Sequence, residues 1–446
     1  MIRFSSEEIA EVIEMLHYLH LDIRAVTLSL NVLHLREWEE VIEYIEKWGL
    51  KLREAVTDVV NKHGVPIVTS RIALPPVQFL LKKDHRSEDL VKLALELDKV
   101  ARKVGIDAIG GFGAFVNVSI DDNGRKVIDA ISEVLSRTQT IFSFINVGST
   151  IDGLNLDAIY ELADVILDTA SKTKGHGNAR FLVSVNLPGD VPFMPGAHHG
   201  FGRPMAEVNV AVSGPGVVEA AIRRSKVNSF RELHETIKKV AFKISRLGEF
   251  TAREVAKRLS VEPGSVDLSL APTPKVGDSV ARIVEAMGIP VFGSPGTLTA
   301  LAIMVDALKK GGSMAVSRFG GFSGLFIPLS EDAGMMEAAQ KGMIDIYKLI
   351  AYTAVCSSGL DMVPIPFVSR ETLASIIADQ LTIGVIHQKP LGVRLLPVPN
   401  SKPGDVVDLG GLLGKGVVIN VEDLSPNTFV KLKGHLPPPI LRLQMG

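Results

Sequence analysis

The feature that most constrains this 446-residue sequence is the alternation of short apolar segments with longer amphipathic ones. The short segments have the length of buried strands, and the longer ones repeat apolar residues with a helical period. This alternation is typical of a mostly parallel sheet whose strands are joined by crossover helices. Strands are predicted at 23–33, 65–72, 107–118, 140–147, 180–186, 207–212, 362–365 and 392–398. Helices are predicted at 5–19, 36–63, 87–104, 123–136, 155–172, 229–247, 277–287, 297–310, 345–355 and 371–387.

The composition supports a large folded core. Hydrophobic residues make up 46% of the chain and charged residues 22%, which excludes a disordered chain. No low-complexity linker divides the sequence. We therefore expect one α/β barrel domain over residues 1–446, with residues 415–446 as an extended, proline-rich C-terminal tail. The longest predicted loop is at 188–204, and long loops in compact domains are often functional.

Charge and hydropathy limit the partners of this chain. The formal net charge of −2 gives no electrostatic reason to expect nucleic acid or a membrane surface. No uncharged apolar run has bilayer-spanning length, and acidic residues at positions 7, 8, 11 and 14 interrupt any secretory signal. We expect a cytoplasmic protein, and the apolar composition and the proline-rich tail favour a homo-oligomer. The single cysteine and few glutamines fit a thermophile.

Cys356 is the single cysteine, so an intramolecular disulfide and a multi-cysteine metal site are both impossible. It follows a predicted helix and precedes a predicted strand. A thiol on such a turn could point into a cavity and act as a nucleophile or proton donor. The alternative interpretation is a buried thiol that packs as a small apolar residue.

His198 and His199 lie in the long loop, in the sequence PGDVPFMPGAHHGFGRP, and are candidate acid/base residues. Neither belongs to a spacing such as HExxH, so the sequence predicts no metal site and identifies no cofactor. A hydrogen bond that braces the loop is the alternative role for each ring.

Glycine-rich turns are candidate sites for a small anion, because their backbone N–H groups suit phosphate or carboxylate. None of these turns matches a P-loop or a dinucleotide fingerprint. Tight turns where only glycine fits are the alternative interpretation. The candidate anion ligands are Ser213, Gly214 and Gly216 in the first turn, and Gly320, Gly321 and Ser323 in the second.

Polar residues within or at the ends of the predicted strands form a third set of candidates. Asn146, Asn209 and Asp267 are expected to converge on one end or on the lumen of a barrel, where ligands usually bind. Buried Asn and Asp side chains are costly unless they are hydrogen-bonded. Each of the three could instead brace a neighbouring loop.

Several long motifs carry a family resemblance. The segments PFMPGAHHGFG, VNVAVSGPGVV, VDLSLAPTPKVGDSVARIVEAMG, GGFSGLFIPLSED, AVCSSGLDMVPIP and DVVDLGGLLG occur in this order. Over about residues 22–414 the chain resembles the domain-of-unknown-function 711 family, also called uncharacterised protein family 0210. The resemblance implies the fold of the pyruvate formate-lyase-like glycyl-radical enzymes, a ten-stranded α/β barrel. In that fold a finger loop inside the barrel carries a catalytic cysteine, which would be Cys356 here.

The resemblance does not extend to the radical chemistry. Glycyl-radical enzymes carry an Arg-Val-x-Gly-aromatic segment near the C-terminus, and the corresponding sequence GGLLGKGVVINVEDLSPNTF lacks it. The chain also differs from the usual family pattern at Leu33, Arg203, Pro295 and 366–369. Fold likeness alone does not define a function.

Three functional hypotheses follow. The first is an enzyme that acts on a small anionic metabolite in the barrel, with Cys356 and a histidine as reactive groups. The second is a regulatory protein that binds such a ligand without turnover. The third is a non-catalytic barrel that assembles into a homo-oligomer. The sequence alone does not decide whether the chain is an enzyme.

Overall fold

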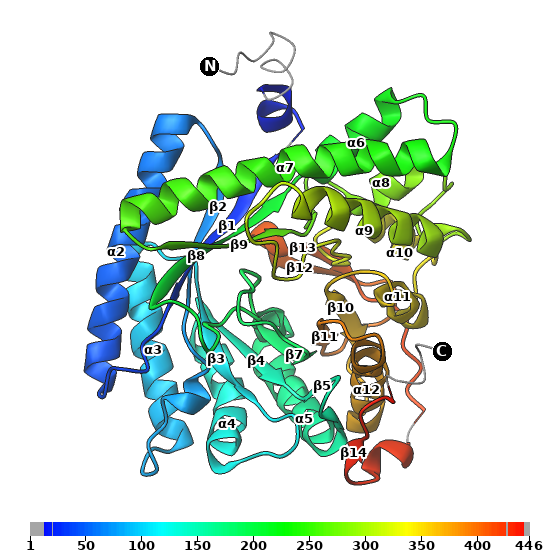
Figure 1. Cartoon of the computed structure of the whole chain (residues 1–446). Coiled ribbons are helices and arrows are strands. Elements are labelled where there is room, and N and C mark those ends of the chain that lie inside the picture. Colours follow the sequence, from blue (N-terminus) through cyan, green and yellow to red (C-terminus); the bar gives the residue numbers. More distant parts are fainter. Residues whose placement is uncertain (1–12, 20, 425–426, 441–446) are drawn as a thin grey trace.

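The computed structural model describes residues 13–19, 21–424 and 427–440. Its centre is a nine-stranded sheet with the order β10-β11-β7-β4-β3-β2-β1-β8-β9 (Figure 1). The strands are β1 (Asp22–Leu30), β2 (Ile67–Ala73), β3 (Ala108–Phe115), β4 (Ile141–Asn146), β7 (Phe181–Val185), β8 (Ala206–Ser213), β9 (Glu262–Leu268), β10 (Gly359–Pro366) and β11 (Leu391–Val398).

The strands fall into two groups that run in opposite directions. Strands β1, β2, β3, β4 and β7 pair in parallel, as do β8 with β9 and β10 with β11. The two groups meet at antiparallel junctions, β1 with β8 and β11 with β7. The predicted mostly parallel sheet is therefore confirmed. Buried residues occupy both faces of most strands, which explains their nearly continuous apolar sequences.

The two edge strands are bridged by the segment 318–330, which is not itself one of the nine strands. Its Arg318 carbonyl accepts a hydrogen bond from Val266 N of β9 at 2.9 Å, and its Leu329 N donates to the Asp361 carbonyl of β10 at 3.1 Å. Isolated parallel bridges also join the segment to both strands. One irregular segment thus hydrogen-bonds to both edges of the sheet.

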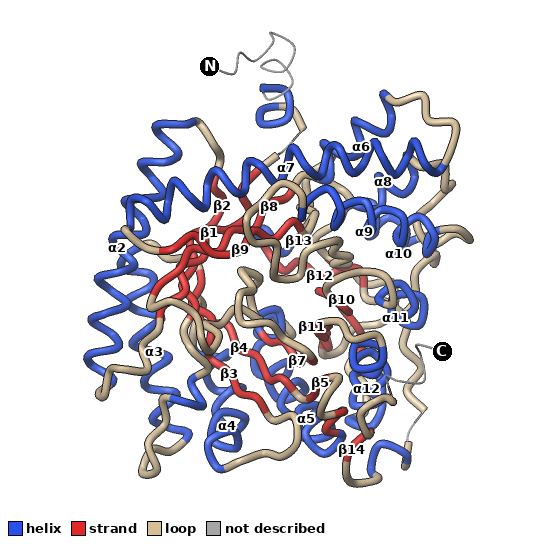
Figure 2. Tube along the Cα trace, in the orientation of Figure 1, coloured by secondary structure: helices blue, strands red, loops and turns tan. Residues whose placement is uncertain are grey.

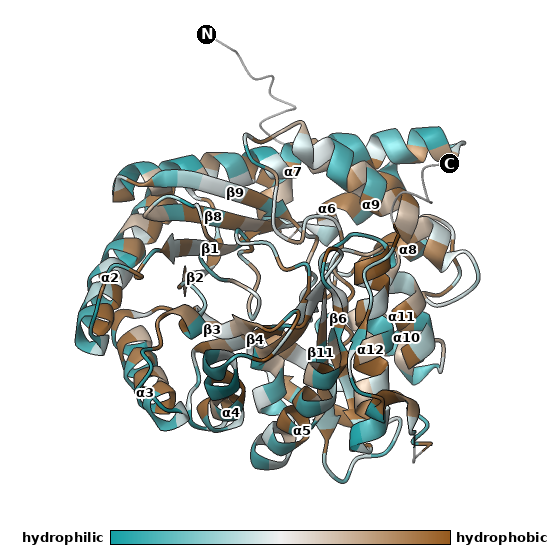
Figure 3. Ribbon diagram, turned by 60° about the horizontal axis from the view of Figure 1, so that its bottom comes forward, coloured by the Kyte–Doolittle hydropathy of each residue, from teal (hydrophilic) through white to brown (hydrophobic). Residues whose placement is uncertain are grey.

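Helices lie outside the sheet, which curves around an interior (Figures 2 and 3). Helix α7 packs against β8 and β9, and α12 packs against β11. The helices are α2 (Trp38–His63), α3 (Ser87–Val104), α4 (Asp122–Arg137), α5 (Leu156–Thr173), α6 (Pro215–Arg224), α7 (Phe230–Leu259), α8 (Val280–Ala286), α9 (Thr297–Ser313), α10 (Ala333–Gln340), α11 (Ile346–Thr353) and α12 (Arg370–Ile386). None of those described is long and apolar enough to cross a membrane.

The predicted elements agree with the structure except in the middle of the chain. Strand β9 and helices α6 and α10 were not predicted, and α7 extends well beyond its predicted end. Strand β9 contains Pro263 and Gly264, which weaken a strand signal and are tolerated here because β9 is an edge strand. The helix predicted at 5–19 lies largely outside the described residues, and residues 13–17 of it are helical.

Smaller elements complete the described chain. Strands β5 (Gly148–Ser149), β6 (Gly153–Asn155) and β14 (His435–Leu436) form a three-stranded sheet, which ties the predicted C-terminal tail to the α/β domain. Strands β12 (Val406–Gly410) and β13 (Gly414–Val417) form a hairpin after β11, which we call the C-terminal hairpin.

The long loop between β7 and β8, residues 186–205, enters the interior of the curved sheet. Val191 and Ala197 in this loop are fully buried. A side chain at Gly110 of β3 would collide with the backbone carbonyl of Ala197, so the loop lies directly on the inner face of the sheet. We call residues 186–205 the inner loop.

Candidate functional site

A cavity of about 500 Å³ lies inside the curved sheet. Residues near the amino ends of β1, β3, β4 and β7 line it, together with residues near the carboxyl ends of β8 and β9. The inner loop and the C-terminal hairpin complete its wall. This volume is within the usual range for sites that bind small molecules.

Four arginines line this cavity: Arg24 on β1, Arg71 on β2, Arg180 beside β7 and Arg394 on β11. Three of them lie within apolar strands, so strand geometry fixes which face each guanidinium occupies. Arg24 and Arg394 are 9% and 4% exposed, so their charges are almost entirely removed from bulk water. Buried charges require partners.

Arg71 has hydrogen-bonding capacity that the described chain does not use. Its Nε donates to Thr69 Oγ1 at 2.9 Å and its Nη1 donates to the Pro192 carbonyl at 3.2 Å. Its Nη2 has no hydrogen bond to any described residue. Burial and the neighbouring charge of Arg24 lower the Arg71 pKa to about 10, so the group stays ionised at neutral pH in an unfavourable environment.

Arg24 lies on β1, the strand paired with the β2 strand of Arg71, three register positions from it. Thr69 Oγ1 donates to the Arg24 carbonyl at 2.7 Å, which links the two strands at this point. The Arg24 Nη2 donates to the carbonyls of Ala271 and Pro272 at 2.6 and 2.5 Å. Its Nε and Nη1 have no hydrogen bond to the described chain, so Arg24 also has N–H donors that a ligand could use.

Arg394 is held by two carboxylates. Its Nε donates to Asp361 Oδ1 at 2.6 Å, and both side chains are almost completely buried. Its Nη2 lies 3.4 Å from Glu331 Oε1. The two carboxylates raise the Arg394 pKa against the opposing effect of burial. Arg394 thus serves mainly as a buried counter-charge.

Two carboxyl groups of the cavity titrate near neutrality. Burial raises the pKa of Asp267 to about 7, and burial outweighs the nearby Arg394 to raise the pKa of Glu331 to about 7. Asp267 Oδ2 accepts a hydrogen bond from Phe322 N at 2.8 Å, whereas Oδ1 has no partner among the described residues. Strongly shifted acids in a cavity are typical of functional sites.

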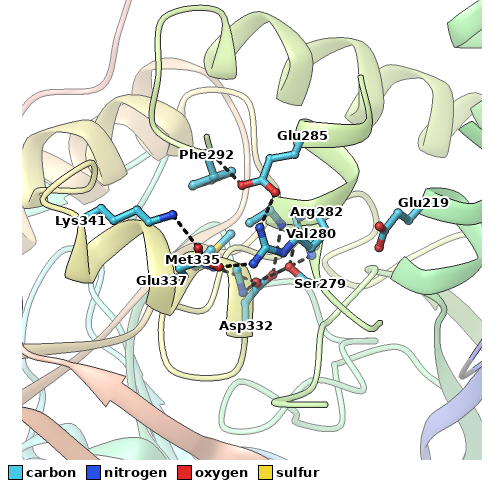
Figure 4. A network of polar contacts seen from close by, with 12 residues as sticks. Glu219, Ser279, Val280, Arg282, Glu285, Phe292, Asp332, Met335, Glu337 and Lys341 are labelled. Carbon is cyan, nitrogen blue, oxygen red and sulfur yellow. Dashed lines mark hydrogen bonds and ion pairs between the residues drawn. The ribbon is translucent and has the colours of Figure 1, made fainter. Parts of the chain in front are cut away.

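Asp332 fixes the backbone next to Glu331. Its buried carboxylate accepts hydrogen bonds from Ser279 Oγ at 2.5 Å and Val280 N at 2.7 Å at the start of α8, and from Met335 N at 3.0 Å in α10 (Figure 4). One carboxylate therefore caps two helices. We interpret this network as structural, because both carboxylate oxygens of Asp332 already accept hydrogen bonds from the chain and the network holds Glu331 at the cavity wall.

The electrostatic balance of the cavity favours an anion. It is lined by four guanidinium groups, while Asp267 and Glu331 are each partly protonated at neutral pH because their pKa values are near 7. Asp107 also lines the cavity; its Oδ2 accepts a hydrogen bond from Ser70 N at 2.8 Å, and its negative charge offsets one of the four positive charges. Excess positive charge in a water-poor space attracts a small anion more strongly than it would in bulk water.

Of the residues predicted to form a site, only Asp267 lines this cavity. Asn146 is instead fully hydrogen-bonded: its Nδ2 donates to Asn117 Oδ1 at 2.7 Å, and its Oδ1 accepts from Leu187 N at 3.2 Å. Asn209 Oδ1 accepts from Ser265 N at 2.7 Å. Asn146 thus connects β4 to the inner loop and another loop, whereas Asn209 connects β8 to its neighbouring strands β9 and β1.

The two histidines lie in the inner loop and are almost completely buried. His198 Nδ1 lies 3.1 Å from the Gly196 carbonyl, and its ring packs against Phe115 and Phe144. Both ring nitrogens of His199 are without a hydrogen-bond partner among the described residues. Burial lowers the pKa of each histidine to about 4, so both rings are neutral near pH 7.

Cys356 lies in the turn between α11 and β10. Its side chain is fully buried within the main hydrophobic cluster and does not line the cavity. The Lys389 ammonium donates to the Cys356 carbonyl at 2.5 Å and to the Thr353 carbonyl at 2.7 Å. The segment that occupies the interior as a finger is the inner loop, which contains no cysteine. A catalytic role for Cys356 stays a prediction.

The predicted anion turns are tightly packed against other parts of the chain. A side chain at Gly216 would collide with the Gly277 carbonyl, and one at Gly321 would collide with Asp267 Oδ2. Gly321, with a φ of 68°, therefore positions the Asp267 carboxyl. The remaining members of this set, Ser213, Gly214, Gly320 and Ser323, also lie outside the cavity wall.

Sequence reasoning missed the arginines, Glu331 and the hairpin leucines 409 and 413. A usable signal was present: Arg71 and Arg394 are each the one charged residue of their strand, and Arg24 shares β1 with a single other charge, Asp22 at its first position. A charge at such a position is buried and needs a partner. Among the described residues no group of three or more His, Cys, Asp or Glu side chains is arranged to hold a metal ion.

Comparison with known proteins identifies the family. The family described as Uncharacterised ACR (DUF711) matches residues 14–410. A UPF0210 protein of Pyrobaculum aerophilum is 50% identical over the whole of both chains. A UPF0210 protein of Halothermothrix orenii is 44% identical over 98% of this chain and 99% of the relative. The chain therefore belongs to the DUF711 family, as its motifs predicted.

The likeness to a solved structure is much weaker. An anaerobic ribonucleotide reductase covers 84% of this chain and 71% of its own, with 8% identity and a TM-score of 0.35. A likeness at this level carries no argument about function, and the site is interpreted from its own residues.

Proposed function

We propose that this protein is an enzyme that binds a small organic anion in the arginine-lined cavity and transfers a proton on it. The observation that supports the proposal is the convergence of four guanidinium groups and two carboxyl groups, with pKa values near 7, on one space of about 500 Å³. Arg71 and Arg24 bind the anion, and Asp267 and Glu331 act as acid and base.

The arginines are suited to the binding step. The unused donors of Arg71 and Arg24 come from adjacent strands, and a planar guanidinium can bind a carboxylate or phosphate with two hydrogen bonds. A bound anion also reduces the mutual repulsion that lowers the Arg71 pKa. Binding of an anion is therefore expected to be favourable even though it must lose its water shell.

The two acids are suited to the chemical step. General acid–base catalysis is most effective when the pKa of the catalytic group is close to the working pH. Asp267 is near the carboxyl end of β9, and Glu331 follows the segment that joins β9 to β10, so the two carboxyls reach the cavity from different elements. One can accept a proton from the bound anion while the other donates one.

The binding step is tested by calorimetric titration of the full chain with inorganic phosphate and with malonate at low ionic strength. We expect Arg71→Met to weaken binding of both anions at least tenfold. Arg125→Met is the matched control, because Arg125 lies on the surface of α4 in an exposed ion pair with Glu161. Equal binding by Arg71→Met and by the unchanged chain would contradict the proposal.

The chemical step is tested by incubating the protein with a cell metabolite extract and following small anions by mass spectrometry. We expect the unchanged chain to convert at least one organic acid, and Asp267→Asn to lose this conversion. Asp58→Asn is the control, because Asp58 is exposed on α2. If Asp267→Asn converts the acid at the same rate, Asp267 is not the acid or base.

We further propose that the segment 318–330 takes the place of a tenth strand and closes the sheet into the barrel that the family resemblance implies. Its hydrogen bonds to β9 and β10 support this, including Gly324 N to the Leu268 carbonyl at 2.7 Å. Slow hydrogen exchange of the Gly324 and Leu329 amides, comparable with that of the central strands, is expected. Exchange as fast as in an exposed loop would contradict closure.

Homo-oligomerisation and a cytoplasmic location stay predictions. A size measurement in solution tests the first, and fractionation of the source cell tests the second.

A further inference from the structure

We infer that the ligand of the cavity is a carboxylic acid with a compact apolar body, such as an aromatic or branched-chain acid, and not a phosphorylated sugar. The inference rests on the proposed function and names the class of anion that it uses. It follows from the apolar wall of the cavity, the part of the lining that the charged residues do not form.

That wall is apolar and comes from widely separated parts of the chain. It contains Phe142, Phe193, Met194, Phe326, Leu409 and Leu413. An inorganic anion or acetate would touch the arginines and leave most of a 500 Å³ space in contact with water or empty. An apolar group attached to the carboxylate would remove this surface from water, which is favourable.

Phe193 lies where the charged wall meets the apolar wall. Its ring centre is 5.2 Å from the Arg394 guanidinium carbon and 4.9 Å from the Phe326 ring, which it meets edge-on. One aromatic ring therefore borders both the cationic and the apolar surface. The atoms of a ligand that follow directly after its carboxylate would lie against this ring.

Away from the charged groups, the lining has few polar side chains for the hydroxyl groups of a sugar: Thr69, Gln139, His176 and Ser269. Thr69 Oγ1 already donates to a backbone carbonyl and accepts from Arg71. Both ring nitrogens of His176 lie within hydrogen-bonding distance of backbone carbonyls, those of Thr173 and Asp408, at 3.2 and 3.1 Å. Hydroxyls buried against phenylalanine without partners are destabilising, so a polyhydroxylated ligand is disfavoured.

The C-terminal hairpin covers the apolar part. Leu409 in β12 and Leu413, next to β13, both reach the cavity wall, and the Asp408 carbonyl lies beside His176. The hairpin thus places two aliphatic side chains where the body of the ligand would lie.

The test is a calorimetric titration of the full chain with phosphate, acetate, benzoate and phenylacetate at low ionic strength. We expect phenylacetate to bind at least tenfold more tightly than acetate. Leu409→Ser and Phe142→Ser should each remove most of this preference and leave phosphate affinity within twofold. Retained phosphate binding also shows that each variant is folded.

The outcomes separate the two proposals. If phosphate binds in an Arg71-dependent way but phenylacetate binds no more tightly than acetate, the ligand class is wrong and the anion site stands. If Arg71→Met binds phenylacetate as well as the unchanged chain does, the arginines are not the receptor and the proposed function fails. If none of the four anions binds, both proposals fail.

Discussion

Buried polar side chains at one end of the interior have all their hydrogen-bond partners, whereas Arg71 and Asp267 at the other end do not. Near the carboxyl ends of β1 and β4, the side-chain amides of Asn146 and Asn209 are fully hydrogen-bonded to residues of strands, of a loop and of the inner loop. At the other end, Arg71 and Asp267 retain unused polar atoms beside a cavity. The comparison teaches that burial and position near a strand end do not identify a site. Unfilled hydrogen-bonding capacity next to open space is the better reason to propose one.

The largest expected effect is on the buried ion pair of the cavity end. Arg394→Met leaves Asp361 without its guanidinium, and we expect a loss of about 3–5 kcal/mol in the free energy of unfolding. Urea unfolding measures this. The exposed pair of Arg125 and Glu161 is the control, where Arg125→Met should cost about 0–1 kcal/mol. Similar losses in both variants would mean that the cavity end is well solvated.

The second prediction concerns the pH dependence of stability through Asp267. Its pKa is about 7 in the folded protein and 3.8 ordinarily, so between these values the folded state holds a proton that the unfolded state releases. Stability from this group is therefore present at low pH and is lost as pH rises towards 7. Relative to the unchanged chain, Asp267→Asn should gain stability from pH 4 to 7.5, by up to about 4 kcal/mol. A pH-independent difference would contradict the raised pKa.

His199 should show the opposite sign. Its pKa is about 4 when folded and 6.5 ordinarily, so the unfolded state takes up a proton that the buried ring does not. The stability contributed by the neutral ring is present above pH 6.5 and is lost as pH falls towards 4. His199→Gln should remove up to about 3 kcal/mol of this acid sensitivity in urea unfolding measured between pH 4 and 7. If the free energy of unfolding of His199→Gln falls with decreasing pH as steeply as that of the unchanged chain, His199 is protonated in the folded state.

The fourth prediction contrasts a variant that lowers stability with a variant that loses binding. Asn209→Ala leaves the buried Ser265 N–H without its acceptor and should cost about 1–3 kcal/mol with no change in phosphate affinity. Arg71→Met should change stability by less than about 1 kcal/mol, because it removes a crowded charge, but should abolish phosphate binding. Unfolding and calorimetry on both variants measure the contrast. If Asn209→Ala weakens binding as much as Arg71→Met does, the two ends are coupled.

The smallest effect is expected at Cys356. Because the thiol packs as a small apolar group, Cys356→Ala should cost about 1 kcal/mol and leave phosphate binding unchanged. The thiol should also react with a disulfide reagent only after unfolding. Rapid labelling of the folded protein, or a tenfold loss of binding in Cys356→Ala, would restore Cys356 to the site.

Much of the fold could be predicted, because apolar runs of strand length mark β1 to β4, β7, β8, β10 and β11 directly. Strand β9 was not predicted because Pro263 and Gly264 interrupt its sequence. The sequence also does not show that β9 lies at the edge of the sheet, where these residues are tolerated. The site was harder to predict, because its residues are far apart along the chain. Asp267 was singled out only as a polar residue in the segment VDLSLAPTP, because the strand that carries it was not predicted. The function of Arg71 depends on which face of β2 is inside, which only the pairing of strands decides.

The cavity is lined by residues from early and from late parts of the chain. Arg24 lies on the first strand of the sheet, whereas Arg394 lies on β11 and the hairpin that covers the cavity comes later still. During synthesis the first arginine leaves the ribosome long before its neighbours exist, so it must stay hydrated until then. The β1–β4 half can pair early, but its charged inner surface can be sealed only near the end of translation. We therefore expect nascent chains that stop before β11 to retain a water-accessible Arg71, and ligand to bind only after release of the complete chain.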